Sequence, residues 1–401
     1  MKSDYDIIII GNGIVGASVA CALAALNLSI AIIDQKSMGK TAISADNEAD
    51  GRKIALSFGS YKILQHLQIW PRLSKHTTPI KQVHISKKGS FASTRLHAKD
   101  INAEFLGYVV PAEILLQTLN NATISYSNII HFCPATLLDI NATVPSVKIK
   151  FNKKIKTITA KLIIAADGAL SYSRNLLKLP VTEKDYQQTA LVTSVKIKND
   201  CTNIAYQRLI GDAVMALLPM QKQTYCIVYT GSNNTVNNLM ALDEKSLCDF
   251  LQQKFGYRLG RFNHLGPRFT YPLKLIIATK QIFEHVLLIG NAAHNISPVA
   301  AQGFNLALQD IYCLQQLCKK FPQDYLHVLE DYQRQRLPEQ QRIIKFTDHL
   351  MTWSKNKSLA VLQSLGLFLF DLSPTLKQQL ITLNMGLTPP VQLLTRSIDA
   401  K

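Results

Sequence analysis

Short, uninterrupted apolar runs are the clearest pattern near the start of the chain. Residues 5–10 read YDIIII, and β-branched residues without polar alternation are typical of a buried parallel strand. Residues 17–26 are rich in alanine and leucine and predict a helix, and residues 29–33 predict a second buried strand. The order strand, helix, strand predicts a βαβ unit in an α/β fold.

The turn between this first strand and the helix carries a spaced glycine pattern. Gly11, Gly13 and Gly16 form Gly-x-Gly-x-x-Gly, and Asp34 ends the second strand. The first glycine permits a tight turn, the second lets the backbone approach a pyrophosphate, and the third lets the helix pack closely on the strand. The carboxylate can accept a hydrogen bond from a ribose hydroxyl. The unit predicts a dinucleotide site, and a glycine-rich turn without a ligand is the alternative.

Two later apolar runs also end in polar motifs. Residues 162–166 lead into Asp167 and Gly168, which are followed by Ser171 and Arg174. Arg174 is either a cofactor contact or a surface or helix-capping arginine. The run at 286–289 leads into GNAAHNISPVAAQGFN.

The rest of the chain divides into a strand-rich middle and a helical end. Residues 191–279 alternate with a period of two and predict strands. Residues 304–349 predict helices with a break at Pro338. A short apolar helix is expected after residue 358.

The positive charge is confined to two windows. The chain has 44 Lys+Arg and 27 Asp+Glu, a net charge of +17. Residues 52–99 contain ten bases and no acid, and residues 140–166 contain six lysines and no acid. Such an excess suits nucleic acid, an anionic membrane surface or an acidic partner. The first window has few aromatic residues, so we expect no nucleic-acid binding, which is the non-enzyme alternative.

Cysteine usage and hydropathy restrict the class of protein further. The seven cysteines are scattered without a CxxC pair, so we expect no metal site and a reducing, cytoplasmic setting. The longest uncharged apolar stretch, residues 358–370, is shorter than the ~20 residues that span a bilayer. The start of the chain has too short an apolar run for a signal peptide. We therefore expect a soluble protein, with peripheral contact to the inner face of a membrane as a further expectation.

The three motifs together resemble a known enzyme family. Gly-x-Gly-x-x-Gly, Asp-Gly-x-x-Ser-x-x-Arg and the 290–305 segment occur in the order and spacing of the FAD-dependent aromatic hydroxylases of the p-hydroxybenzoate hydroxylase type. Residues 50–57, 84–96 and 106–110, and the later patterns around residues 370–377 and 385–387, are similar to the ubiquinone-biosynthesis hydroxylases, in particular the 2-polyprenyl-6-methoxyphenol hydroxylases.

This resemblance implies a fold and a domain division. We expect a Rossmann-like FAD-binding domain of the GR2 type with an inserted β-sheet substrate domain and a C-terminal helical segment. The FAD-binding domain is expected at residues 1–75, 100–185 and 280–345. The substrate domain is expected at residues 76–99 and 186–279, and the helical segment at 346–401.

The resemblance also implies the residues of the site. Pro298 is expected to place its backbone near the flavin C4a atom, and no side-chain base is identified. His294 is a candidate base, with a structural role at the flavin rim as the preferred alternative. Asn291 stands where the family more often has Asp, and its amide can still accept from a hydroxyl. The FAD contacts are expected from Gly11, Gly13, Gly16, Asp34, Arg52, Gln117, Asp167, Gly168, Gly290, Asn291, Ala301, Gln302, Gly303 and Asn305.

The activity that the resemblance implies is hydroxylation of the aromatic ring of a polyprenyl phenol in ubiquinone biosynthesis. Reduced flavin would react with the co-substrate O2 to give a C4a-hydroperoxide, which the phenol attacks. The electron donor is left open between NADPH and a redox protein. Other quinone-biosynthesis proteins are expected partners. The alternatives are hydroxylation of another aromatic substrate, or FAD-dependent reduction of isoprenoid double bonds on the same scaffold.

Overall fold

A six-stranded sheet with five parallel strands forms one end of the molecule. The computed structural model describes residues 3–38, 51–90, 93–198, 202–296, 302–353 and 385. The strand order is β19-β20-β12-β1-β2-β8, and only the edge strand β19 is antiparallel to its neighbour. The strands are β1 (Ile7–Ile10), β2 (Ile30–Ile33), β8 (Ile129–Phe132), β12 (Leu162–Ala165), β19 (Ile282–Phe283) and β20 (Val286–Leu288).

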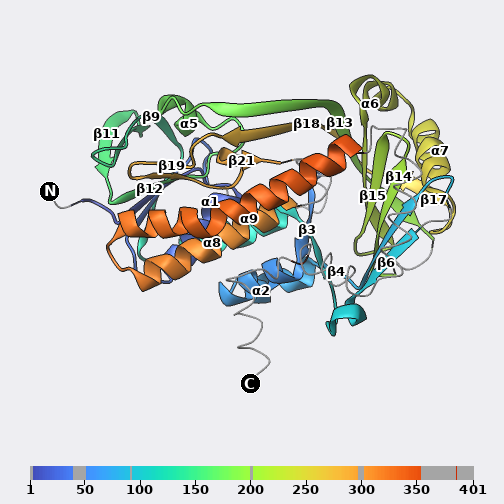
Figure 1. Cartoon of the computed structure of the whole chain (residues 1–401), viewed down its shortest axis with the longest axis horizontal. Helices are drawn as coiled ribbons and strands as arrows, with labels where there is room; N and C mark the ends of the chain where they lie inside the picture. The colour runs from blue at the N-terminus through green and yellow to red at the C-terminus, as the bar shows by residue number, and fades with distance from the viewer. Residues whose placement is uncertain are drawn as a thin grey trace.

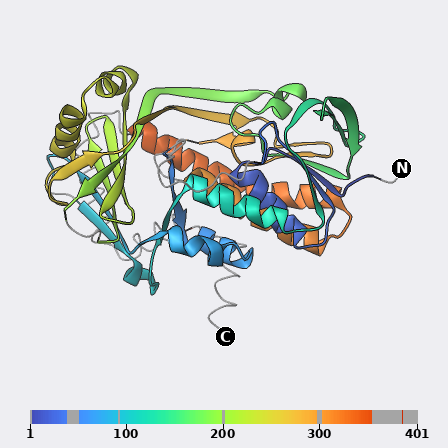
Figure 2. The same ribbon diagram turned by 180° about the vertical axis from the view of Figure 1, so that it is seen from behind.

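Alternate residues of β1 enter two different hydrophobic cores. Ile7 and Ile9 pack with the helices on one face of the sheet, whereas Ile8 and Ile10 pack with a three-stranded sheet on the other. Because both faces are buried, the strand is apolar throughout and not alternating. The helices are α1 (Ile14–Ala24), α4 (Ala112–Ile124), α8 (Gln302–Lys320) and α9 (Tyr325–Trp353) (Figures 1 and 2). The three-stranded sheet is β9 (Ala135–Asn141), β10 (Ser146–Phe151) and β11 (Lys154–Thr159).

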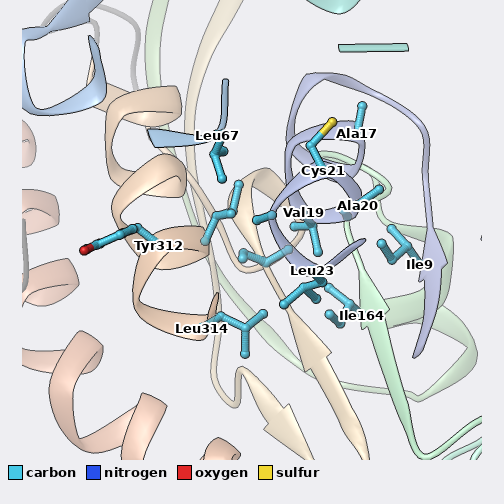
Figure 3. Packing of buried hydrophobic residues seen from close by; sticks show 14 of the residues in the cluster. Ile9, Ala17, Val19, Ala20, Cys21, Leu23, Leu67, Ile164, Tyr312 and Leu314 are labelled. Atoms are coloured by element: carbon cyan, nitrogen blue, oxygen red, sulfur yellow. The ribbon is translucent and has the colours of Figure 1, made fainter. Parts of the chain in front are cut away.

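Helix α1 lies at the centre of the first core. Its alanine and leucine side chains face the strand residues Ile9 and Ile164 on one side and Leu314 of α8 on the other (Figure 3). Cys21 is fully buried here, and its thiol lies 3.8 Å from the carbonyl oxygen of Leu119 in α4. Small side chains let α1 approach the sheet closely, which places its N-terminus at the sheet edge.

A second, mainly antiparallel sheet forms the other end of the molecule (Figures 1 and 2). Its path is β21-β18-β13-β16-β15-β14-β5-β6, with β17 paired to β13. Helices α6 (Asn233–Met240) and α7 (Glu244–Phe255) cover one face and share a buried core with it. The strands are β5 (Gln82–Lys87), β6 (Ser93–His97), β13 (Val181–Ile197), β14 (Ile204–Ile210), β15 (Ala213–Pro219), β16 (Thr224–Ser232), β17 (Phe262–Leu265), β18 (Phe269–Ala278) and β21 (His294–Asn295).

A small sheet and short helices lie between the two large sheets. The order of the small sheet is β3-β7-β4. Its strands are β3 (Lys53–Ser57), β4 (Thr78–Ile80) and β7 (Gly107–Pro111). The remaining helices are α2 (Phe58–His66), α3 (Trp70–Leu73), α5 (Tyr172–Leu176) and the 3-10 turns η1 (Ser74–His76), η2 (Ala98–Ile101) and η3 (Gly290–Ala292).

Two sequence expectations about secondary structure are wrong. Helix α9 continues through Pro338 without a break. A proline removes one helical hydrogen bond, and buried residues on both sides of it, including Tyr332 and Ile343, hold the helix against its neighbours. The strand-rich middle also contains α6 and α7, whose caps Ser232 and Asp243 accept from backbone N–H groups three residues later. The apolar run at 358–370 lies outside the described residues.

Within the described part of the chain, no helix is both long and apolar enough to cross a membrane.

Two glycines of the first turn predict opposite responses to substitution. A Cβ on Gly16 would lie 1.8 Å from the carbonyl oxygen of Gly11, whereas one on Gly13 would meet nothing within 4 Å. Gly16→Ala should therefore force α1 away from β1 and lower the free energy of unfolding by about 3 kcal/mol or more. Gly13→Ala should change it by less than about 1 kcal/mol. Urea unfolding of both variants checks this, and equal stabilities would contradict it.

Candidate functional site

Each predicted motif follows directly on the carboxyl end of a parallel strand. Gly11 follows β1, Asp34 follows β2, and Asp167 lies two residues after β12. Gly290 lies two residues after β20. Because β1, β2, β12 and β20 run parallel, these four turns meet at one edge of the sheet. Such an edge is where open α/β sheets bind ligands.

The glycine turn is held in place by backbone contacts and by Asp34. Gly11 has a φ of +99°, which a residue with a side chain rarely adopts, and its N–H donates to the carbonyl oxygen of Ile33 at 2.8 Å. The backbone N–H of Asn12 donates to Asp34 Oδ2 at 2.5 Å, and that of Lys36 donates to Oδ1 at 2.7 Å. Each carboxylate oxygen retains further acceptor capacity.

The geometry around Gly13 fits a bound pyrophosphate. Gly13 is exposed, no side chain caps the N-terminus of α1, and space is open where its Cβ would lie. The buried Oδ1 atom of Asn12 has no hydrogen-bond partner among the described residues. Free N–H groups at a helix start attract phosphate, and an unpaired acceptor suits a hydroxyl donor. The residues present therefore fit a dinucleotide of the FAD type.

The Asp-Gly motif lies in the turn that precedes α5 (Tyr172–Leu176). Asp167 accepts from the Ser171 hydroxyl at 2.6 Å and from the Ser173 N–H at 2.9 Å, so its carboxylate caps this helix. Gly168 has a φ of +87°, and a Cβ there would meet nothing within 4 Å. The carboxylate thus shapes the turn.

Arg174 joins two of the motifs. Its side chain is buried, and its guanidinium donates to the carbonyl oxygens of Ala169 and Ala292, both at 2.9 Å. Ala169 belongs to the Asp-Gly turn and Ala292 to η3. Of the two roles left open for this residue, the surface arginine is excluded, and the geometry supports a positioning role.

The start of α8 lies beside η3. A Cβ on Gly303 would lie 3.9 Å from Asn291 Oδ1, and Asn291 itself is exposed at the sheet edge. Gln302 is buried at the first turn of α8. Gly290 has a φ of +60° and packs against Val15 of α1. These four predicted residues therefore lie together near the glycine turn.

Asn305 contacts the protein in a way that the sequence did not suggest. Its Oδ1 accepts from the Ser57 N–H at 2.9 Å and from the Ser60 hydroxyl at 2.7 Å, and its amide donates to the Ala55 carbonyl at 3.0 Å. This buried side chain clamps α8 to β3 and to the start of α2. Arg52 is exposed and precedes β3 directly.

Gln117 lies partly buried on α4, the helix that packs against α1. Pro298 and Ala301 lie outside the described residues. The described residues contain no group of three or more His, Cys, Asp or Glu side chains arranged to hold a metal ion.

His294 belongs to a fully buried ionic cluster. Its Nε2 lies 3.3 Å from Asp310 Oδ2 in α8, and Asp310 Oδ1 accepts from Arg336 Nε of α9 at 2.7 Å. Burial alone would raise the pKa of Asp310, but the charge of Arg336 and the hydrogen bond from His294 outweigh it and lower the pKa below its usual value. The cluster fixes the segment after η3 against both long helices, which supports the structural role of His294.

The sequence offered only an indirect signal for Arg336. It lies in a strongly polar stretch that reads as a solvated helix face, yet only 1% of its side chain is exposed. A carboxylate on α8 at helical spacing from the glycine motif was the available hint, since a buried Asp requires a cation.

The comparisons with known proteins agree with this geometry. Residues 4–347 match the FAD binding domain family, so the chain belongs to that family. The predicted FAD cofactor and the predicted fold class are thereby confirmed.

Relatives match over nearly the whole chain. The chain is 27% identical to the ubiquinone hydroxylase UbiL of Rhodospirillum rubrum, covering 96% of this chain and 91% of the relative. It is 25% identical to the 3-demethoxyubiquinol 3-hydroxylase of Escherichia coli, covering 95% and 98%. The solved structure of the p-nitrophenol 4-monooxygenase PnpA of Pseudomonas putida shares the fold, with a TM-score of 0.76 at 13% identity, covering 96% of this chain and 99% of that chain.

The open space at Gly13 predicts a variant that folds but binds FAD poorly. In Gly13→Ala the added methyl group would occupy the space where the pyrophosphate approaches the backbone, so FAD affinity should fall about tenfold or more. Titration of the apoprotein followed by quenching of flavin fluorescence measures this. The urea midpoint of the same variant is the control, and unchanged affinity would contradict the placement.

The buried cluster of His294, Asp310 and Arg336 predicts how the free energy of unfolding falls at acid pH. Asp310 has a folded-state pKa below the unfolded value of about 3.9, so its stabilisation is present above that pH and is lost as pH falls toward the folded pKa. Asp310→Asn should lower the free energy of unfolding at neutral pH by about 3–5 kcal/mol, because it leaves the Arg336 charge buried and unpaired. Urea unfolding at several pH values should also show that the free energy of unfolding of Asp310→Asn depends less on pH in the acid range than that of the wild type.

A double variant separates this charge effect from a packing effect. Asp310→Leu combined with Arg336→Met removes both charges, and it should recover most of the stability lost by Asp310→Asn. A double variant as unstable as the single one would show that the loss arises from packing.

Proposed function

We propose that this chain is an FAD-dependent monooxygenase that hydroxylates the aromatic ring of a polyprenyl phenol in ubiquinone biosynthesis. The observation that carries the proposal is the meeting of four motif turns at one edge of the parallel sheet, in a chain that matches the FAD binding domain family over residues 4–347. Two full-length relatives are named as hydroxylases of ubiquinone or its precursor, which supports the substrate class.

The residues of the edge would divide the work of holding FAD. The N–H groups at the start of α1, next to Gly13, would bind the pyrophosphate, and Asp34 would accept from the adenosine ribose. Gly290, Asn291, Gln302 and Gly303 would lie along the ribityl chain and flavin, where helix N–H groups favour negative charge. Arg52 and Gln117 would contribute from β3 and α4.

FAD, when bound, supplies the oxygen chemistry, for which O2 is the co-substrate. The chain's own residues bind and orient it: Arg174 holds the Asp-Gly turn and η3 together, and the cluster of His294, Asp310 and Arg336 holds the segment that follows. The electron donor is NADPH or a redox protein.

The domain division is part of the proposal. The FAD-binding domain comprises residues 1–75, 100–185 and 280–345, and the substrate domain comprises residues 76–99 and 186–279. The C-terminal helical segment is proposed at residues 346–401, of which only residues 346–353, the end of α9, and residue 385 are described. We further propose contact with other quinone-biosynthesis proteins and peripheral contact of this cytoplasmic enzyme with an anionic membrane.

Deletion of the gene in its host tests the pathway. We expect loss of ubiquinone and accumulation of a precursor that lacks one ring hydroxyl, measured by mass spectrometry of lipid extracts. Complementation with Gly13→Ala should be weak, whereas the surface variant Lys150→Gln should restore ubiquinone. Unchanged quinone in the deletion strain would count against the proposal.

Isotopically labelled O2 distinguishes hydroxylation from the reductase alternative. A monooxygenase transfers one labelled oxygen atom into the phenol product, whereas a reductase of isoprenoid double bonds transfers none. A product with a reduced isoprenoid double bond and no labelled oxygen would contradict the monooxygenase proposal and support the reductase.

A further inference from the structure

Two arginines of the second sheet lie close together without an acidic partner. Arg208 lies on β14, and Arg258 lies in the loop that follows α7. Neither guanidinium forms an ion pair with a carboxylate of the described residues. Strand β14 and helix α7 lie at the end of the molecule opposite the N-terminus (Figure 1).

The surroundings of Arg208 leave part of its guanidinium unsatisfied. Its Nη1 lies 3.4 Å from the hydroxyl of Ser86 on β5, a long hydrogen bond to a neutral group. Its Nε is buried and has no hydrogen-bond partner among the described residues. A buried donor of a charged group that is left unpaired is costly, so an acceptor from solvent or from a bound anion would stabilise it.

Arg258 adds a second charge at the same place. Its Nη1 lies 2.7 and 3.0 Å from the two ring nitrogens of His84, a side chain with only 2% exposure on β5. Burial and the charge of Arg258 lower the pKa of the Arg208 guanidinium. Two like charges held this close repel one another unless an anion lies between or beside them.

The strand register brings these groups to one face. Parallel pairing of β14 with β5 sets Tyr206 beside His84 and Arg208 beside Ser86. Side chains two residues apart share a face of a strand, so all four lie on the face that α7 covers. The aromatic rings form an apolar floor, since Tyr206 meets His84 edge-on at 5.8 Å. Two positive charges thus lie beside this face, with Arg208 half-buried and Arg258 exposed to solvent.

We propose that Arg208 and Arg258 form a binding site for a phosphate-type anion on the helix-covered face of the second sheet. Planar guanidinium groups match the geometry of phosphate oxygens, and Ser86 can donate or accept beside them. The phosphate belongs either to an anionic lipid headgroup or to a soluble phosphorylated compound. The site is independent of the proposed hydroxylase activity, because β14 and β5 lie far along the second sheet from β21, the strand that follows η3.

Thermal unfolding of the flavin-loaded protein tests the site. Inorganic phosphate, compared with chloride at equal ionic strength, should raise the melting temperature of the wild type. Arg258→Gln should weaken the apparent phosphate affinity about tenfold or more, because a charged donor is lost. Without phosphate this variant should melt no lower than the wild type, because repulsion is relieved.

Matched variants keep the result interpretable. Lys150→Gln removes one charge from an exposed side chain of β10, in the window 140–166, and should respond to phosphate like the wild type. Arg208→Gln should lose the response as Arg258→Gln does. If Arg208→Gln does not fold, the phosphate response of Arg258→Gln, a variant at an exposed position, decides the test. A wild type that is indifferent to both phosphate and anionic vesicles, or variants that respond like it, would overturn the site.

Vesicle co-sedimentation identifies the source of the phosphate. One sample contains phosphatidylglycerol and phosphatidylcholine in equal parts, and the other contains phosphatidylcholine alone. Binding to the anionic vesicles that Lys150→Gln retains and Arg258→Gln loses assigns a lipid headgroup. A phosphate response without vesicle binding assigns a soluble compound.

Discussion

The close approach of two backbones holds the FAD end of this molecule together. At Gly16 the first turn of α1 lies so near the carbonyl of Gly11 that no side chain fits between them. This contact sets the height of α1 above β1 and therefore the position of its free N–H groups at the sheet edge. The turns after β2, β12 and β20 can contact the same ligand only because they meet at that point. Buried alanines along α1 maintain the approach over the length of the helix.

Side chains then connect turns that the sheet alone would leave independent. Arg174 spans from the Asp-Gly turn to η3, and the Asp310 cluster joins the next segment to both α8 and α9. Buried ionic groups add little net stability compared with apolar packing, but they tolerate few alternative arrangements. In this chain they lie at the segments that must hold a large cofactor in one orientation, and not in the strands, whose apolar residues already specify their positions.

The sequence predicted those parts of the molecule that depend on neighbouring residues. Buried strands such as β1 are predictable because both of their faces are apolar, which gives an uninterrupted apolar run. The glycine spacing is predictable because it belongs to one local turn. Helices α6 and α7 were missed because they are inserted between strands of the second sheet, and their apolar residues were not separated from the surrounding strand pattern. The depth of Arg336 was unpredictable for another reason: its partner Asp310 lies on a different helix, so that only the packing of α8 on α9 creates the pair.

The same distinction applies to the second sheet. The concentration of basic residues in residues 52–99 was visible from composition, yet the two arginines without an acidic partner among the described residues lie outside that window. The parallel pairing of β14 with β5 brings Arg208 to Ser86, and the loop after α7 brings Arg258 to His84, both of which are inside the window. Net charge therefore located the region approximately and did not identify its residues.

The Asn305 clamp alters how losses of flavin should be understood in this fold. Asn305 belongs to a cofactor motif, but its side chain is hydrogen-bonded to Ser57, Ser60 and Ala55. It therefore couples the position of α8 to that of β3, the strand that begins directly after Arg52. Damage at Asn305 would reach the cofactor through displacement of a neighbouring strand. A residue in a cofactor motif can thus act by aligning two segments that would contact the ligand, and not only through its own bond to the ligand.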